Sequence, residues 1–292
     1  MTPRDQHLLF RRYPLEGVVR IGSTDAPTPY HIYDGSMLFI GGTADGTRAR
    51  ELLRGERLTP ILDDQGSALM ALWVCNFTAA SLDPHHELQF SIFASPQPEP
   101  PVEAHPLAIF RLLALNPRAV MVCHGLWNNT PLVVEYNRSH LGLDARLCAS
   151  RISATEAANE GRMQFGFDDF EGGGCIAEGD VLIPGRQGRR ILLDLLRHVG
   201  VGGTLNAARS PFIHVPVANP ITPDLPENRV AHTYAVNDSQ VLRPYDGSQD
   251  HLAIHHPLYA ALRFRPAFVQ QAEGVRFVYL RPEALPVPAA AV

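Results

Sequence analysis

A glutamate at the start of an apolar segment is the first residue in this sequence that could carry chemistry. Glu87 follows His85 and His86 and precedes Leu88-Gln89-Phe90, a pattern typical of a strand. A carboxyl group that points into a barrel loses its hydration, which raises its pKa and suits it to proton transfer. The alternative is an exposed glutamate at a strand edge.

Two further side chains could complete a site. His124 follows the apolar run 119–123, and a histidine there could shuttle protons near neutral pH; a hydrogen-bonded core histidine is the alternative. Arg146 could bind a carboxylate or an enolate oxygen through two parallel hydrogen bonds, unless it is a surface strand arginine. All 25 basic residues other than histidine are arginines, so no side chain can form an imine.

The other motifs in the sequence give weaker evidence for a functional site. His251, His255 and His256 have a spacing that suggests metal ligands on a helix, but Pro257 follows at once and no glutamate completes a His-Glu-x-x-His pattern. We therefore predict no metal site. No Gly-x-Ser-x-Gly sequence occurs, which argues against acyl transfer by a serine hydrolase. The glycine runs 172–174 and 200–203 are interpreted as turns.

Composition narrows the class of protein. The chain has 292 residues, 45% of them hydrophobic, and a net charge of −5. That charge argues against a nucleic-acid partner. The sequence shows neither a signal-peptide pattern nor an 18-residue apolar stretch, so we expect no membrane partner. The four cysteines are far apart, which favours reduced thiols and a cytoplasmic location. The sequence leaves open whether a homo-oligomer forms.

The elements that must position these residues are mostly strands. Apolar or alternating segments predict strands at 36–40, 68–77, 88–93, 119–123, 147–152, 212–217, 230–236 and 275–280. Helical spacing predicts helices at 43–54, 105–115, 130–141 and 190–199. Many strands with a few dispersed helices indicate an α+β, mainly β fold. We predict a single domain over residues 1–283 and a flexible tail over residues 284–292.

The segment 126–146 resembles the centre of acetoacetate decarboxylase-like proteins. Asn137-Arg138-Ser139 stands where that family has Gly-Arg-Glu, and Gly142-Leu143-Asp144-Ala145-Arg146 stands where it has the run that bears the Schiff-base lysine. Ala145 takes the lysine position, and Arg146 takes the position of a second cation. The resemblance spans roughly residues 30–150 and places Glu87 on the family's active-site glutamate.

The resemblance implies a cone-shaped antiparallel β-barrel with flanking helices around one cavity. It implies catalytic roles for Glu87, Arg146 and His124, and substrate binding by His86, Trp127, Asn128, Asp144 and Arg138. Core packing remains an alternative for Trp127, and helix anchoring for Arg138. Without a lysine, imine decarboxylation is excluded. We expect a cofactor-independent lyase or cyclase that acts on a β-keto, hydroxy-carbonyl or polyketide-like small molecule. The alternatives are a non-catalytic binding protein and a hydrolase with a Glu87- or His124-activated water.

Overall fold

The computed structural model describes residues 7–156, 161–183, 212–223 and 225–285. Its helices are α1 (Leu8–Arg12), α2 (Gly46–Leu52), α3 (Ala108–Leu115), α4 (Pro131–Ser139) and α6 (Pro257–Ala260). The first strands are β1 (Gly17–Ile21), β2 (Thr24–Thr28), β3 (Tyr30–Ala44), β4 (Thr59–Pro60), β5 (Ala68–Ala80), β6 (His85–Ser95), β7 (Val120–Asn128), β8 (Ala145–Glu156) and β9 (Gly161–Asp169). The later strands are β10 (Gly174–Ile183), β11 (Ile213–Ala218), β12 (Arg229–Val236), β13 (Ser239–Pro244), β14 (His251–Ile254), β15 (Arg265–Glu273), β16 (Arg276–Tyr279) and β17 (Glu283–Ala284).

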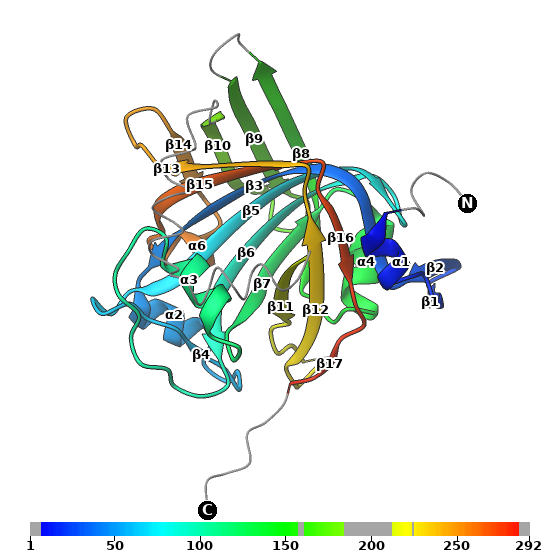
Figure 1. Cartoon of the computed structure of the whole chain (residues 1–292), viewed down its shortest axis with the longest axis horizontal. Helices are drawn as coiled ribbons and strands as arrows, with labels where there is room; N and C mark the ends of the chain where they lie inside the picture. The colour runs from blue at the N-terminus through cyan, green and yellow to red at the C-terminus, as the bar shows by residue number, and fades with distance from the viewer. Residues whose placement is uncertain (1–6, 157–160, 184–211, 224, 286–292) are drawn as a thin grey trace, which may run out of the picture.

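Seven strands close into a barrel. The main sheet runs β7-β11-β12-β16-β3-β5-β6, and β6 also pairs with β7, which joins the two ends of the row. Figure 1 shows this as a strongly curled sheet with β3, β5, β6 and β7 side by side. The pairs are antiparallel except for β7 with β11 and β7 with β8, which are parallel. The predicted mainly β fold class is confirmed, and its antiparallel pattern is broken at β7.

Strand β7 is the junction of the molecule. One edge pairs with β6 from Val120 to Asn128. The other edge is divided, because Met121 and Val122 pair with β11 whereas Leu126 to Asn128 pair with β8. Strand β8 then leaves the barrel and continues into a row with β9, β10 and β14 (Figure 1).

Alternation along the strands produces two cores. Successive side chains in a strand point to opposite faces. The inner cluster, inside the barrel, includes Phe39, Trp73, Leu126, Val217 and Tyr279, together with side chains of α3 and α4. The outer cluster includes Leu38, Val74, Leu88, Trp127 and Phe167, and it fills the space between the barrel wall and β9, β10 and α6. A residue on β3, β5, β6 or β7 therefore faces either the interior or the second row of strands.

Several sequence-based boundaries change. The predicted helix 43–54 begins only after Asp45, whose carboxylate accepts hydrogen bonds from the backbone N–H groups of Thr47 and Arg48. The segment expected to be helical at His251 is strand β14. Ala284, placed in the tail by the sequence, pairs with Arg229. The predicted helix 190–199 and residues 286–292 lie outside the described residues.

A membrane-spanning helix is not found in the part of the chain that the structure describes. The cysteines there are free thiols, of which Cys75, Cys123 and Cys148 are buried.

Candidate functional site

Glu87 lies on the inner face of the barrel wall. It is paired with Cys75 on β5 and with Asn128 on β7. Burial raises the pKa of its carboxyl group to about 7, against an opposing effect of the hydrogen bond from Asn128. The side chain is surrounded by protein yet keeps some accessible surface. Such a group exchanges a proton near neutral pH, which is what a general acid or base requires.

A chain of buried amides holds the glutamate. Asn128 donates to Oε2 of Glu87 at 3.1 Å, and Asn137 of α4 donates to Oδ1 of Asn128 at 2.9 Å. Both asparagines are buried. The chain fixes the rotamer of the carboxylate and ties it to α4. It also satisfies polar groups that would otherwise be costly to bury.

Tyr30 and His85 form a second polar pair in the interior. The Tyr30 hydroxyl lies 3.1 Å from Nε2 of His85, and Nδ1 of His85 lies 2.8 Å from the carbonyl oxygen of Asp83. Burial lowers the pKa of His85 to about 4, so the ring is neutral at pH 7. Burial and then the charge of Glu87 raise the pKa of Tyr30 well above its usual value. His85 precedes Glu87 by two residues on β6, so the two side chains lie on the same face of the strand.

Two buried donors in the interior have no partner. Among the described residues, the Tyr279 hydroxyl and Nε1 of Trp73 make no hydrogen bond. Both side chains belong to the inner cluster. Burial, then the nearby Cys123 and Glu87, raise the pKa of Tyr279. Since β16 does not adjoin β6 or β7, Tyr279 faces Glu87 and Cys123 across the barrel.

Arg146 does not join Glu87. Its neighbour Ala145 is fully buried in the inner cluster, and alternation turns Arg146 to the outer face. There Arg146 pairs with Asp144 at 2.9 Å and lies over the ring of Trp127 at 5.7 Å. The expectation that Arg146 binds an oxyanion beside Glu87 is wrong, because the barrel wall separates the Arg146 and Glu87 side chains.

His124 is turned outward by a β-bulge. The register shifts so that Phe90 pairs with Gly125 and Ser91 with Cys123, which leaves His124 unpaired. Its Nδ1 lies 3.0 Å from the hydroxyl of Tyr259, a residue of the outer cluster. Strict alternation from Asn128 would have placed His124 inside; the extra residue of the bulge re-aims it. Burial lowers its pKa to about 4, so it is a neutral core histidine.

The remaining predicted substrate-binding residues also lie away from Glu87. His86 faces outward, with Nδ1 2.9 Å from the Ser150 hydroxyl. Trp127 is packed in the outer cluster, and Asp144 is held by Arg146. Arg138 donates to the carbonyl oxygen of Ala145 and so anchors α4 to β8. Of the predicted residues, the structure brings together Glu87 and Asn128.

Tyr30, His85, Asn137 and Tyr279 were not among the residues predicted from the sequence. Asn137 and Tyr279 stand in segments predicted to be a helix and a strand, whereas Tyr30 and His85 lie before the predicted strands 36–40 and 88–93. The convergence of the four side chains depends on the closed register of the barrel. In the histidine motif, His251 lies on β14 and Nε2 of His255 lies 3.3 Å from the Glu178 carboxylate. Within the described ranges, no group of metal-ligating side chains gathers at one point.

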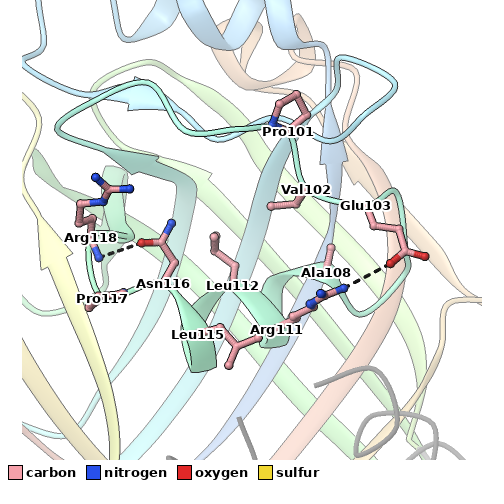
Figure 2. A pocket seen from close by; sticks show the side chains of 10 residues that line it. All are labelled: Pro101, Val102, Glu103, Ala108, Arg111, Leu112, Leu115, Asn116, Pro117 and Arg118. Atoms are coloured by element: carbon pink, nitrogen blue, oxygen red, sulfur yellow. Dashed lines mark hydrogen bonds and ion pairs between the residues drawn. The ribbon is translucent and has the colours of Figure 1, made fainter. Parts of the chain in front are cut away.

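A pocket on α3 lies apart from this site. Figure 2 shows it between α3 and the loop at Pro101, with Leu112 and Val102 in its wall and an ion pair of Arg111 with Glu103 at 3.3 Å along its side. Its lining includes neither Glu87 nor a residue that contacts it. We do not assign the chemistry to it.

Known proteins with this architecture support the fold. No family model and no curated protein match the sequence. Acetoacetate decarboxylase from Legionella pneumophila subsp. pneumophila str. Philadelphia 1 superposes with a TM-score of 0.56 at 11% identity, over 94% of this chain and 97% of that chain. The enduracididine biosynthesis enzyme MppR, complexed with pyruvate, gives 0.55 at 12% identity, over 94% of this chain and 100% of that chain. An acetoacetate decarboxylase-like enzyme from Sphingomonas wittichii RW1 gives 0.50 at 11% identity, over 88% and 92% of the two chains.

This chain therefore has the acetoacetate decarboxylase fold, as the resemblance in segment 126–146 implied. At these identities the likeness is one of fold. Ala145, which the sequence resemblance places at the Schiff-base lysine, has its side chain in the inner cluster.

Proposed function

We propose that this protein is an enzyme that moves a proton on a small carbonyl compound inside the barrel, as a lyase or cyclase does in enol chemistry. The observation that carries the proposal is the Glu87 carboxyl group, enclosed in the barrel with a pKa raised to about 7 by burial. A base with a pKa near the working pH combines the correct protonation state with a useful driving force for proton transfer.

No imine takes part in this chemistry. The chain has no lysine, and the inward-facing residue at the corresponding position is Ala145. Acetoacetate decarboxylase itself forms its imine through a lysine whose amine is activated by desolvation or a neighbouring cation. Here the enolate must be formed directly by a carboxylate base, with hydrogen-bond donors in place of the positively charged imine nitrogen.

Deuterium exchange tests the proposal across several classes of carbonyl compound. A panel of β-keto acids, hydroxy ketones and aryl ketones is incubated with the protein in D₂O, and incorporation next to the carbonyl group is measured by mass spectrometry. We expect exchange with at least one class. Glu87→Gln should reduce the exchange rate by about 10²–10⁴-fold, the usual range for a general base.

The direction in which the exchange rate changes with pH shows whether Glu87 acts as a base. The carboxylate is the active form of a base, so exchange should rise from pH 6 to pH 8 through the pKa of about 7, and Glu87→Gln should lack this rise. Glu103→Gln, an exposed control, should keep the full rate.

Tight ligand binding without exchange by the wild-type protein would instead identify a non-catalytic binding protein. Hydrolysis of an ester that depends on Glu87 would favour a hydrolase.

A further inference from the structure

The walls of the interior above Glu87 are aromatic. Phe39 and Trp73 stack with ring centroids 4.2 Å apart, and Phe268 meets Phe39 edge-on at 5.4 Å. Trp73 pairs with Gln89, two residues along β6 from Glu87 on the same face. At the other end of the same face, Tyr30 lies 5.6 Å from Tyr136 of α4 and 6.3 Å from Phe277.

Several side chains of this interior are not fully covered by the rest of the protein. Met37, Trp73, Phe277 and Tyr279 point inward, yet each retains partial exposure. Aromatic faces bind flat apolar groups through dispersion and stacking. An occupant with an aromatic or otherwise unsaturated body would cover these rings.

Among the described residues, no arginine forms an ion pair or a hydrogen bond with the Glu87 carboxylate, whose hydrogen-bond donor is Asn128. The pKa of Glu87 is set by burial and Asn128, and the pKa of Tyr279 by burial, Cys123 and Glu87. Arg146, the cation expected here from the sequence, is on the outer face, paired with Asp144. The described residues would therefore offer a carboxylate-bearing substrate no positive charge to compensate for the hydration that it loses beside Glu87.

The interior does offer hydrogen-bond donors. The Tyr279 hydroxyl is enclosed and, among the described residues, unpartnered, and so is Nε1 of Trp73. A buried donor left without an acceptor costs about 1–3 kcal/mol. A carbonyl oxygen on a bound molecule would satisfy Tyr279 while the rest of that molecule lies against the rings.

We propose that the substrate is an uncharged ketone with an aromatic or polyene body, and that the Tyr279 hydroxyl donates to its carbonyl oxygen. This substrate class rests on the proposed function of Glu87. The Glu87 carboxylate takes the proton from the carbon next to the carbonyl group. The C–H electron pair forms the C=C bond, and the C=O π pair moves onto the oxygen, which accepts the hydrogen bond from Tyr279. Glu87 then returns the proton to carbon, or to a leaving hydroxyl group, which departs as water.

Two probes of matched size separate charge from shape. We choose 2-acetylnaphthalene, an uncharged aryl ketone, and 2-naphthoate, which has the same ring and a carboxylate. Calorimetry at pH 8 gives both affinities for the wild-type protein. The chain has two tryptophans, so Trp127→Phe leaves Trp73 as the only one, and quenching of its fluorescence reports occupancy of the interior.

We expect the ketone to bind and quench Trp73, and 2-naphthoate to bind at least tenfold more weakly. Tyr279→Phe should weaken ketone binding about 2–10-fold, the value of one neutral hydrogen bond. Tyr234→Phe removes a hydroxyl on the outer side of the barrel, where the ring stacks on Tyr13, and should leave the affinity unchanged.

Stronger binding of 2-naphthoate, absence of ketone binding, or an unchanged affinity in Tyr279→Phe would each overturn the inference. The assay measures binding alone, so it is separable from the proposed proton transfer. If the ketone binds through Tyr279 but no compound of the panel exchanges deuterium, the ligand class stands and the enzymatic function fails. If a charged β-keto acid exchanges with Glu87 dependence, the function stands and the ligand class fails.

Discussion

At the scale of the residue, Glu87 differs from an ordinary glutamate through its surroundings. Its only polar contact among the described residues is the 3.1 Å hydrogen bond from Asn128, and the rest of its environment is the inner cluster. Removal from water penalises the charged form more than one amide donor favours it. The same imbalance that prepares the group for proton transfer should also appear in the stability of the protein.

Glu87 should make the folded state less stable as the pH rises. Its pKa is about 7 in the folded protein and 4.5 in its ordinary state, so between these values the folded protein holds a proton that the unfolded chain has lost. This contribution is fully present below pH 4.5 and is lost as the pH rises through 7. The difference corresponds to about 3 kcal/mol.

Chemical denaturation at pH 5 and pH 8 measures this effect. The free energy of unfolding of Glu87→Gln, relative to wild type, should increase by about 2–3 kcal/mol between the two values. Taking the difference removes the opposite contributions of His85 and His124, whose lowered pKa values stabilise the fold as the pH rises. An equal difference at both pH values would mean that Glu87 ionises normally, which speaks against its role as the base.

At the scale of the element, strand β8 decides what an inserted lysine could do. Ala145 faces the interior and Arg146 the outer cluster, although the two are adjacent. With pyruvate and borohydride, the wild-type protein should gain no adduct on a side chain, because lysine is the only residue whose side chain supplies an amine for a reducible imine. The Arg146→Lys variant should also form no adduct inside the barrel, because residue 146 faces the outer cluster.

Ala145→Lys should behave differently, because it places an amine in the barrel interior. We expect an adduct that intact-mass spectrometry detects and peptide mapping places at position 145, in protein whose circular dichroism matches wild type. An adduct at position 146 and none at position 145, in folded proteins, would contradict the assignment of the two faces.

Helix α4 is linked to the site by a single buried amide. Asn137→Ala removes the donor to Asn128 and leaves that carbonyl oxygen without a partner. The loss should be about 1–3 kcal/mol in the free energy of unfolding. Ser139→Ala, at the exposed end of the same helix, removes a hydrogen bond to the carbonyl oxygen of Glu135 and should change stability by less than about 0.5 kcal/mol. Equal losses in urea unfolding would show that the amide chain is not a buried support.

At the scale of the whole molecule, a buried arginine joins its ion-pair partner to a strand that is distant in sequence. Arg243 of β13 binds Asp250, just before β14, at 2.6 Å and also donates to the carbonyl oxygen of Leu182 on β10. The Asp250 side chain has no exposed surface. Because the contact spans both rows of strands, we expect the domain to unfold as one unit.

Calorimetry tests this expectation. Wild type should show one transition, with equal calorimetric and van't Hoff enthalpies. Asp250→Asn should shift the whole transition and cost about 3–5 kcal/mol, since it leaves Arg243 largely buried without its charged partner. Asp238→Asn, which breaks the more exposed pair with Arg276, should cost less than about 1 kcal/mol. Two separate transitions would contradict a single domain.

The sequence by itself determined the class of fold and the identity of the candidate acid–base group. Apolar strands, the motif around Asn137 and the absence of lysine are local properties, and they were sufficient to indicate a mainly β barrel and to exclude an imine on a lysine side chain. Glu87 could be selected because the resemblance places it on an active-site glutamate; by residue type alone, an exposed glutamate at a strand edge remained the alternative.

Only the tertiary structure decided which side chains share a face with Glu87. A shift of one residue moves a side chain to the other side of a sheet. Residue type alone therefore could not show that Ala145 faces the interior and Arg146 the outer cluster. The bulge at His124 reverses the face that strict alternation predicts, and its cause is the pairing of β7 with β6. Tyr279 reaches the site through barrel closure, since β16 and β6 are far apart in sequence and meet only across the interior.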